Sequence, residues 1–92
     1  MIGSIQHKGL RLYYTEGDSS KLPQEQLSKI NMIFTALDAV SSEKDIKALG
    51  RGIHRLSGDM RDFWALKVTG NYRIVFRFED DEVLDVDYLD YH

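Results

Sequence analysis

The chain of 92 residues has no cysteine and a single proline, Pro23. Without cysteine it can form no disulfide, no zinc knuckle and no thiol nucleophile, and this absence favours a reducing cytosol. No apolar run approaches the ~18 residues of a membrane span, and no signal peptide is recognisable. We therefore expect a cytoplasmic protein without a membrane partner, whose chemistry comes from His, Asp, Glu, Tyr, Arg and Lys.

Several motifs are also absent. No GxGxxG, Walker loop, nucleophile elbow or HExxH occurs, which excludes the corresponding nucleotide-binding, serine hydrolase and zinc protease classes. Two histidines and a carboxylate could ligate a metal, but they lack a ligand spacing such as His-x-x-x-His. We expect neither a metal nor a cofactor. With 42% hydrophobic and 29% charged residues, residues 1 to 92 form one ordinary globular domain.

Charge is unevenly distributed along the chain. Residues 1 to 43 carry four bases and five acids, residues 44 to 77 eight bases and three acids, and residues 78 to 92 seven acids and no base. The blocks thus sum to −1, +5 and −7. The middle block is a candidate anion-binding surface. Alternatively, the two opposite blocks lie side by side in a sheet and neutralise each other.

Apolar periodicity predicts helices first and strands second. Residues 23 to 40 have apolar side chains every three or four positions after a helix-starting proline, which predicts a long helix. Shorter helices are expected before Gly17 and between Ser42 and Gly50, and residues 1 to 5 suit a strand at one side of a sheet.

From residue 53 onward the apolar period is two, with turns at residues 69 to 71 and 80 to 81. The side chains expected to face the helices are Trp64, Leu66, Val68, Tyr72, Ile74, Phe76, Phe78, Leu84, Val86 and Tyr88. We therefore predict an α+β fold: a mainly antiparallel, twisted sheet with the N-terminal helices packed on one face.

The other face of this sheet should carry cations. Arg73 and Arg77 are four residues apart on one strand, and Lys67 and Phe63 should share their face on the neighbouring strand. Guanidinium and ammonium groups beside an aromatic ring suit single-stranded RNA, which needs phosphate neutralisation and a plane for base stacking. The alternative is that these cations only make the protein soluble.

The last three residues are an acid, a phenol and an imidazole. In a regular strand Asp90 and His92 share the face of Val86 and Tyr88, and Tyr91 points away. Because a buried unpaired carboxylate is costly, these residues must lie at the rim of the sheet. His54 is a second candidate, whereas His7 has no evident partner and is taken as a non-catalytic histidine.

RNA cleavage can run on these groups alone. The substrate supplies its own nucleophile, the 2′-hydroxyl. A base removes the hydroxyl proton, cations stabilise the charge that develops on the phosphate, and an acid protonates the leaving 5′-oxygen. Histidine, with an ordinary pKa of about 6.5, suits both proton transfers.

Almost the whole chain resembles the HigB toxins of the RelE/ParE superfamily. The resemblance is carried by Met1-Ile2 with His7-Lys8-Gly9-Leu10, Leu37-Asp38, His54 with Leu56 and Gly58, Trp64, Asn71-Tyr72-Arg73-Ile74 before Phe76, and the terminal Asp90-Tyr91-His92. It implies a RelE-like, microbial-RNase-type fold and a toxin of a type II toxin-antitoxin system. Such toxins cleave messenger RNA in the ribosomal A site without a metal, leaving a 2′,3′-cyclic phosphate and a 5′-hydroxyl.

The resemblance also implies partners and a residue set. The partners are a HigA-like helix-turn-helix antitoxin, messenger RNA and ribosomal RNA, with DNA contacted only through the antitoxin. The catalytic set is His54, Arg73, Asp90, Tyr91 and His92. In it, His92 oriented by Asp90 activates the 2′-hydroxyl, Arg73 binds the phosphate, and His54 with Tyr91 serves the phosphate or the leaving group.

One position departs from the family pattern. Ser57 stands where the family often has a lysine, which removes one expected phosphate contact, and Arg55, Arg61 or Lys67 could compensate. Two alternatives therefore accompany the nuclease hypothesis. The chain could be a non-catalytic toxin of this fold that blocks a protein such as gyrase, or a weakened family member that binds its antitoxin.

Overall fold

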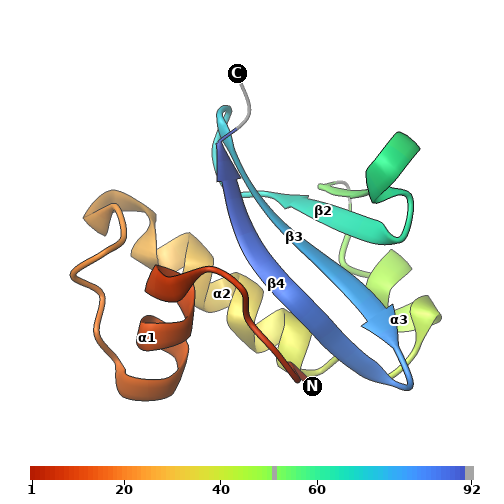
Figure 1. Cartoon of the computed structure of the whole chain (residues 1–92), viewed down its shortest axis with the longest axis horizontal. Coiled ribbons are helices and arrows are strands. Elements are labelled where there is room, and N and C mark those ends of the chain that lie inside the picture. Colours follow the sequence, from red (N-terminus) through yellow and green to blue (C-terminus); the bar gives the residue numbers. More distant parts are fainter. Residues whose placement is uncertain (51, 91–92) are drawn as a thin grey trace.

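The computed structural model describes residues 1 to 50 and 52 to 90. Along the chain the α-helices come first and the strands follow (Figure 1). In chain order they are α1 (Lys8–Glu16), the 3₁₀ helix η1 (Gln24–Gln26), α2 (Leu27–Asp38), α3 (Glu43–Lys47), β1 (Ile53–Arg55), the 3₁₀ helix η2 (Gly58–Met60), β2 (Phe63–Lys67), β3 (Tyr72–Glu79) and β4 (Glu82–Asp90). The predicted catalytic residues Tyr91 and His92 lie outside the described residues. No helix in the described part is both long and apolar enough to cross a membrane.

Local signals in the sequence set the limits of the helices. His7 caps α1, because its Nδ1 accepts a hydrogen bond of 3.2 Å from the backbone N–H of Leu10. Gly17 ends the same helix with a φ of 73°, a left-handed conformation that glycine adopts without strain. His7 therefore has a local structural partner that the sequence did not reveal.

The long helix predicted for residues 23 to 40 is confirmed, with its first turn tightened into η1. Pro23 precedes that turn with a φ of −61°. The buried side chains of α2 recur every three or four positions and are Ile30, Ile33, Phe34 and Leu37. This stripe fixes which side of α2 packs on the sheet.

The four strands form one antiparallel sheet in the order β1-β2-β3-β4. The tight β3–β4 turn is possible because Asp80 and Asp81 both adopt positive φ, at 53° and 65°. Residues 1 to 5 run parallel to the outer edge of β4 through bridges from Ile2 to Val83 and from Ile5 to Val86. The strand expected there is thus reduced to two isolated bridges.

Helices α1, α2 and α3 contribute buried side chains to a core on one face of the sheet, and α2 passes behind the strands in Figure 1. The core between them includes nine fully buried side chains: Leu10, Ile30, Leu37, Val40, Ile46, Ile74, Phe76, Val83 and Val86. Val75 is also fully buried, but it is on the opposite face of the sheet. We call that opposite face the open face. The α+β fold with N-terminal helices on one side of an antiparallel sheet is confirmed.

One predicted orientation on β4 is wrong. Leu84 was expected on the helix side, but it lies opposite Arg77 on the open face, and Val83 is the buried residue. Between the β3 residues Val75 and Arg77, strand β4 has one extra residue, which forms a β-bulge. The bulge returns Val86 and Tyr88 to the helix side. The alternation of side chains along β4 is therefore regular before the bulge and regular after it, but the two parts are out of phase by one residue.

Candidate active site

The open face collects the side chains predicted for RNA binding. Phe63 lies opposite Arg77, and Lys67 lies opposite Arg73. His54 lies opposite Ala65 and so joins the same face from the edge strand β1. Directly opposed residues point to the same side of a sheet, so the expectation of a shared face for Phe63, Lys67, Arg73 and Arg77 is confirmed.

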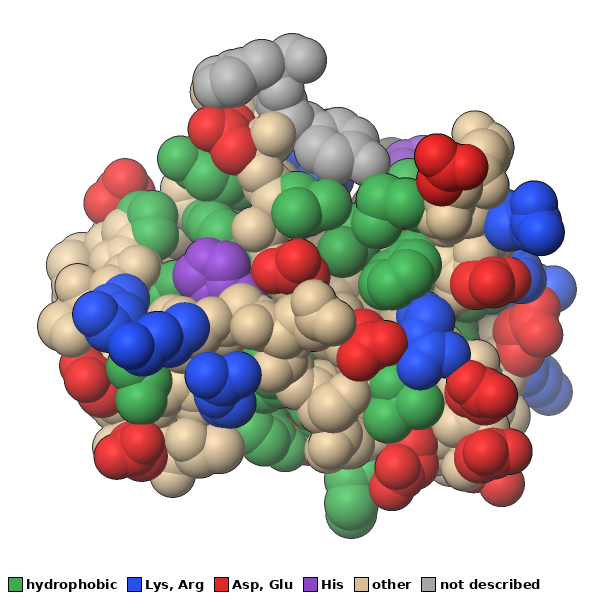
Figure 2. Space-filling model, viewed as in Figure 1, with side chains coloured by type: hydrophobic (Ala, Val, Ile, Leu, Met, Phe, Trp, Pro, Cys, Tyr) green, Lys and Arg blue, Asp and Glu red, His purple; other side chains and the backbone are tan. Residues whose placement is uncertain are grey.

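Small side chains occupy the centre of the open face. Ala65 and Val75 lie opposite each other there and are only 3% and 1% exposed. Figure 2 shows this face, on which hydrophobic side chains are interspersed with acidic and basic ones. This small apolar floor is flanked by Lys67 and Arg73 at one end and by the acid Asp87, which lies opposite Val75.

Arg73 is held by the turn between β2 and β3. Its NH1 group donates to the carbonyl oxygen of Thr69 at 2.8 Å, of Tyr72 at 3.1 Å and of Gly70 at 3.4 Å. These contacts direct NH1 toward the end of the sheet at which β2 ends and β3 begins. Arg73 thus presents its positive charge from a fixed position, as anion binding requires.

Asp90 ends β4 at this same end of the sheet. It lies opposite Tyr72, next to the opposed pair of Arg73 and Leu89, and it is exposed. Its side belongs to the helix face, but the helices do not extend over it, which agrees with the expected position at the rim. The register of three strands therefore brings Lys67, Arg73 and Asp90 to one end of the sheet, with the two cations on the open face and Asp90 on the helix side.

His54 is farther away. It is two strands from β3 and two residues along the sheet from Arg73, which places the two Cα atoms roughly 12 Å apart by ordinary strand spacing. Both belong to the open face on either side of Ala65 and Val75. A phosphodiester bound over this floor can contact both, because arginine and histidine side chains each extend several ångströms from the backbone.

Arg55 lies on the other side of the sheet. It is opposite Trp64, its guanidinium carbon is 5.1 Å from the centre of the indole ring, and its NH1 is 3.7 Å from the Glu43 carboxylate. Its Nε also donates to the backbone oxygen of Arg61 at 3.2 Å. These contacts account for Arg55 structurally and separate it from Lys67 and Arg73.

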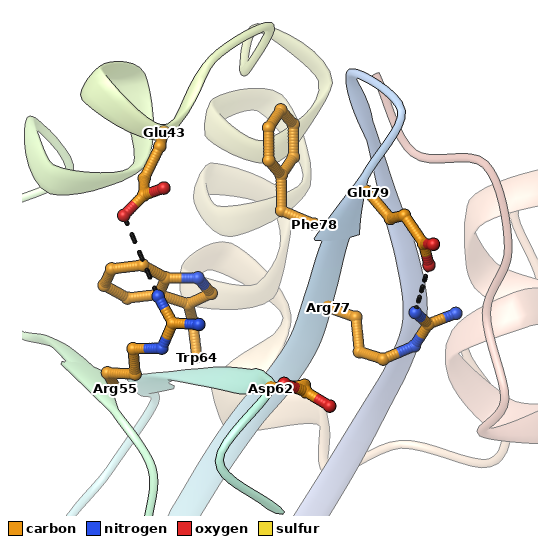
Figure 3. Close-up of a pocket in the computed structure, with 7 residues that line it drawn as sticks. All are labelled: Glu43, Arg55, Asp62, Trp64, Arg77, Phe78 and Glu79. Carbon is orange, nitrogen blue, oxygen red and sulfur yellow. Dashed lines mark hydrogen bonds and ion pairs between the residues drawn. The ribbon is translucent and has the colours of Figure 1, made fainter.

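A pocket of about 270 Å³ lies beside this arginine (Figure 3). Its lining residues are Glu43, Arg55, Asp62, Trp64, Arg77, Phe78 and Glu79. The pocket contains two predicted phosphate contacts, Arg55 and Arg77, but each already pairs with a carboxylate. With three acids and two bases, it is not an anion site.

Arg77 is on the open face and is neutralised there. Its Nε is 2.8 Å from Asp85 Oδ2 and its NH1 is 2.6 Å from Glu79 Oε2. The hydrogen bond to Asp85, followed by that to Glu79, raises the pKa of the Arg77 guanidinium above its usual value. The remaining predicted contact, Arg61, is exposed just after η2, and its phosphate-binding role stays a prediction.

Two tyrosines near Asp90 were predicted only as core residues. Tyr72 and Tyr88 stack with ring centres 5.1 Å apart, and His7 meets Tyr88 edge-on at 5.5 Å. Burial, aided by the nearby acids, raises the pKa of Tyr88 to about 12. The stack fixes the end of β4 that carries Asp90. The alternation of apolar residues predicts that these tyrosines pack in the core, but it does not predict that they support a site.

No group of three or more His, Asp or Glu side chains within the described residues is arranged to hold a metal ion. Asp85 and Ser4, which contact each other near Arg77, were not singled out from the sequence at all. Nothing in the period-two pattern distinguishes Asp85 from an ordinary solvent-facing acid.

Several solved structures have the same fold. A chain of the YoeB–YefM complex from Staphylococcus aureus is similar over 100% of this chain and 98% of that chain, with a TM-score of 0.60 and 14% sequence identity. The YoeB/ParE toxin from Agrobacterium tumefaciens is similar over 100% of this chain and 99% of its own, with a TM-score of 0.52 and 20% sequence identity. These likenesses show that the chain shares the fold of YoeB and YoeB/ParE proteins.

Sequence comparison gives the family. The family described as the RelE-like toxin of type II toxin-antitoxin system HigB matches residues 3 to 92. The chain is also 33% identical over 92 residues to the protein named Endoribonuclease HigB from Proteus vulgaris, covering the whole of both chains. This chain belongs to the HigB-like family of RelE-like toxins, which confirms the resemblance in its sequence. Its partner is accordingly an antitoxin.

Proposed function

We propose that this HigB-family toxin is an endoribonuclease that cleaves messenger RNA in the ribosomal A site without a metal, by attack of the 2′-hydroxyl on the adjacent phosphate. The observation that carries the proposal is the strand register that brings Lys67, Arg73 and Asp90 to one end of the sheet. The name of the Proteus vulgaris relative, an endoribonuclease, supports the same activity.

The reaction needs only proton transfer and charge stabilisation. A base removes the proton from the 2′-hydroxyl, the O2′–P bond forms and the P–O5′ bond breaks, while an acid gives a proton to the departing oxygen. The products are a 2′,3′-cyclic phosphate and a 5′-hydroxyl. Each proton transfer contributes about 10²- to 10⁴-fold in rate, and one well-placed donor to the phosphate about 3 kcal/mol.

The roles proposed for Arg73 and Lys67 are supported by their placement, and those of the other residues follow the family resemblance. Arg73 and Lys67 bind the scissile phosphate, and Arg73 stabilises its developing charge from the position fixed by the turn carbonyls. Asp90 orients His92, which removes the 2′-hydroxyl proton. His54 and Tyr91 serve the phosphate or the leaving oxygen.

Other residues of the open face would bind the rest of the RNA. Phe63 is half-buried opposite Arg77 and offers a ring for base stacking. Arg61 is exposed near the same end of β2 and can reach a flanking phosphate. Arg55 is the weakest candidate of the predicted set, because Trp64 and Glu43 hold it on the other side of the sheet.

The proposed partners are messenger RNA and ribosomal RNA in the A site, with a HigA-like helix-turn-helix antitoxin as the inhibitor. DNA would be contacted only through that antitoxin, and the protein would act in the cytoplasm. Docking on ribosomal RNA requires cations, and the block of residues 44 to 77 supplies them with a net charge of +5.

Expression of the toxin and of its His92→Gln variant tests the proposal. The wild-type protein should arrest growth and produce breaks at defined positions in translated transcripts, seen by primer extension. His92→Gln should abolish both, and Lys29→Gln, an exposed change on the helix side, should abolish neither. Arrest with DNA damage and intact transcripts would instead indicate a blocked protein such as gyrase, and would refute a nuclease.

A further inference from the structure

Strand β4 contains one residue more than its pairing with β3 requires. Leu84 lies opposite Arg77, and Asp87 lies opposite Val75, so Asp85 and Val86 together face the single residue Phe76. This is a β-bulge, and Asp85 is its left-handed residue with a φ of 54°. A non-glycine residue in this region is uncommon, although aspartate tolerates it better than most.

The bulge decides on which face the end of β4 presents each side chain. If Asp85 paired regularly with Phe76, every later residue would move one position along β3. Asp87 would then face Ile74, which is completely buried, and Tyr88 would leave its stack with Tyr72. Asp90 would move from the helix side to the open side of the sheet.

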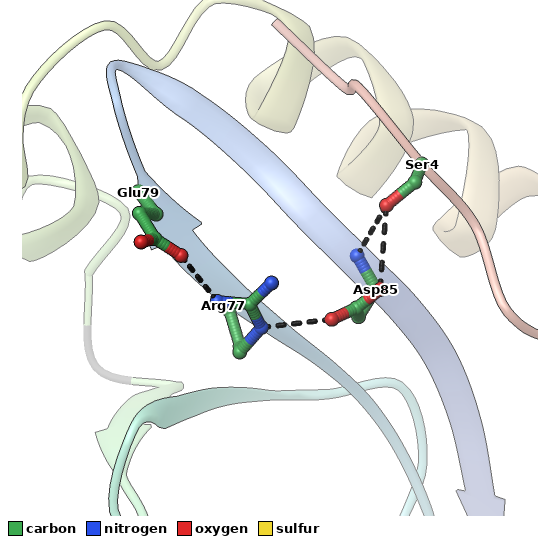
Figure 4. Close-up of polar contacts among 4 residues, drawn as sticks. All are labelled: Ser4, Arg77, Glu79 and Asp85. Atoms are coloured by element: carbon green, nitrogen blue, oxygen red, sulfur yellow. Dashed lines mark hydrogen bonds and ion pairs between the residues drawn. The ribbon is translucent and has the colours of Figure 1, made fainter.

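Contacts from both sides hold Asp85 in this conformation (Figure 4). On the β3 side, Asp85 Oδ2 lies 2.8 Å from Arg77 Nε. On the side of the N-terminal segment, the backbone N–H of Asp85 donates to Ser4 Oγ at 2.8 Å. The backbone N–H of Val86 donates to the backbone carbonyl oxygen of Ser4 at 3.1 Å. Glu79 holds the other arm of Arg77 at 2.6 Å.

This arrangement is poorly suited to RNA. Arg77 carries one positive charge, and its two partners, Glu79 and Asp85, carry two negative charges, so the group sums to −1. A phosphate would have to displace a carboxylate from a short, charge-assisted contact. Arg77 is therefore occupied in fixing the bulge.

We propose that the bulge at Asp85, held by Arg77 and Ser4, is the element that sets on which face of the sheet Asp90 lies at the active end. Arg77 and Asp85 are accordingly positioning residues for the cleavage reaction and not contacts to RNA. The inference rests on the proposed function for its catalytic part, whereas the pairing of β4 can be measured without any activity.

Substitutions at Asp85 separate the shape of the bulge from its charge. Asp85→Val removes the carboxylate and strongly disfavours positive φ, because its branched side chain crowds the backbone. Asp85→Gly also removes the carboxylate but adopts positive φ freely, as glycine commonly does in such bulges. Cleavage of messenger RNA on programmed ribosomes is measured under single-turnover conditions with saturating toxin.

We expect Asp85→Val to cleave RNA about 100-fold more slowly, the loss typical of a misplaced catalytic group. The toxin concentration that gives half of the maximal cleavage rate should be unchanged. Asp85→Gly should keep most of the wild-type rate. Cross-strand NMR contacts should join Asp87 with Val75 in the wild-type protein and in Asp85→Gly, but not in Asp85→Val. Equal rates in all three proteins, or a slow Asp85→Gly with intact Asp87–Val75 contacts, would overturn the proposal.

Arg77→Gln gives an independent answer, including the case in which Asp85→Val does not fold. If Arg77 is a positioning residue, Arg77→Gln should lower the rate of RNA cleavage and leave the salt dependence of ribosome binding unchanged. Loss of a phosphate contact would instead reduce the slope of log affinity against log salt by about one, and that result would refute the assignment. Should the wild-type toxin cleave no RNA, the proposed function fails, and the NMR contacts still decide whether the bulge sets the pairing.

Discussion

Lys67 on β2 and Arg73 on β3 lie directly opposite each other on the open face. Like charges at opposed positions destabilise a sheet, and a bound phosphate relieves this repulsion. The turn carbonyls orient Arg73, whereas Lys67 is exposed on its strand. We therefore assign the larger share of phosphate stabilisation to Arg73.

Arg73→Gln should reduce the rate of RNA cleavage by about 10²- to 10³-fold, the usual effect of removing one donor to a developing negative charge. Arg55→Gln is the matched control, since it removes the same charge from the other face of the sheet. It should leave the cleavage rate nearly unchanged and lower stability by less than about 1 kcal/mol through its lost contacts with Trp64 and Glu43. Comparable losses of cleavage in both variants would contradict the placement of the site on the open face.

Ser57→Lys should increase cleavage. Ser57 is exposed two residues after β1, the strand that carries His54, and its side chain makes no capping hydrogen bond to η2. One added charge-assisted contact of about 1.5 to 3 kcal/mol corresponds to roughly 10- to 100-fold in rate. The control Ser28→Lys adds the same charge on α2 and should change nothing. An unaltered rate for Ser57→Lys would mean that the serine does not weaken the enzyme.

The hydrogen bond between Tyr14 and Asp38 makes stability depend on alkaline pH. The Tyr14 hydroxyl donates to both oxygens of Asp38, at 2.7 and 2.9 Å, and this bond, then burial, raises the pKa of Tyr14 to about 12. Because the unfolded value is 10.0, the bond stabilises the fold fully below pH 10 and loses its effect as pH rises toward 12.

Tyr14→Phe and Asp38→Asn should therefore unfold less steeply with pH than the wild-type protein between pH 10 and about 12, as measured by urea denaturation. At pH 7 the exposed position of the pair limits the loss to about 1 kcal/mol or less. If both variants retained the wild-type slope, Tyr14 would not be the group responsible.

Tyr88→Phe should keep or raise stability. The Tyr88 hydroxyl oxygen is buried and has no hydrogen-bond partner among the described residues. An unpaired buried hydroxyl costs about 1 to 3 kcal/mol, and phenylalanine preserves the ring that stacks on Tyr72. Tyr88→Ala, which also removes the ring, should destabilise the protein by about 3 kcal/mol or more. A clear loss of stability in Tyr88→Phe, seen as a lower thermal midpoint, would reveal a partner for the hydroxyl.

The sequence predicts most of the fold because its periods are long and regular. The apolar stripe predicted for residues 23 to 40 and the alternation along β3 leave few alternatives for which side of each element faces the core. The Lys67–Arg73 pairing also follows, since the short turn at Thr69 to Asn71 fixes the register of β2 on β3.

The errors arise where one residue changes the outcome. The extra residue at Asp85 is invisible to a period-two pattern, because Leu84 and Val86 look equivalent in sequence but lie on opposite sides of the sheet. Strand β1 has only three residues, too few to establish alternation, so the helix-side position of Arg55 could not be inferred. The pairing of Arg77 with Asp85 depends on that same bulge.

The bridges between residues 1 to 5 and β4 join the two most distant parts of the described chain. Strands β2, β3 and β4 are connected by short turns and can form from local contacts, whereas the bridge from Ile2 to Val83 closes a loop of about 80 residues. We expect this segment to dock last during folding and to detach first under native conditions. Amide hydrogens of Gly3 and Gln6, which bond to β4, should then exchange with solvent well before that of Ile74 in the centre of the sheet.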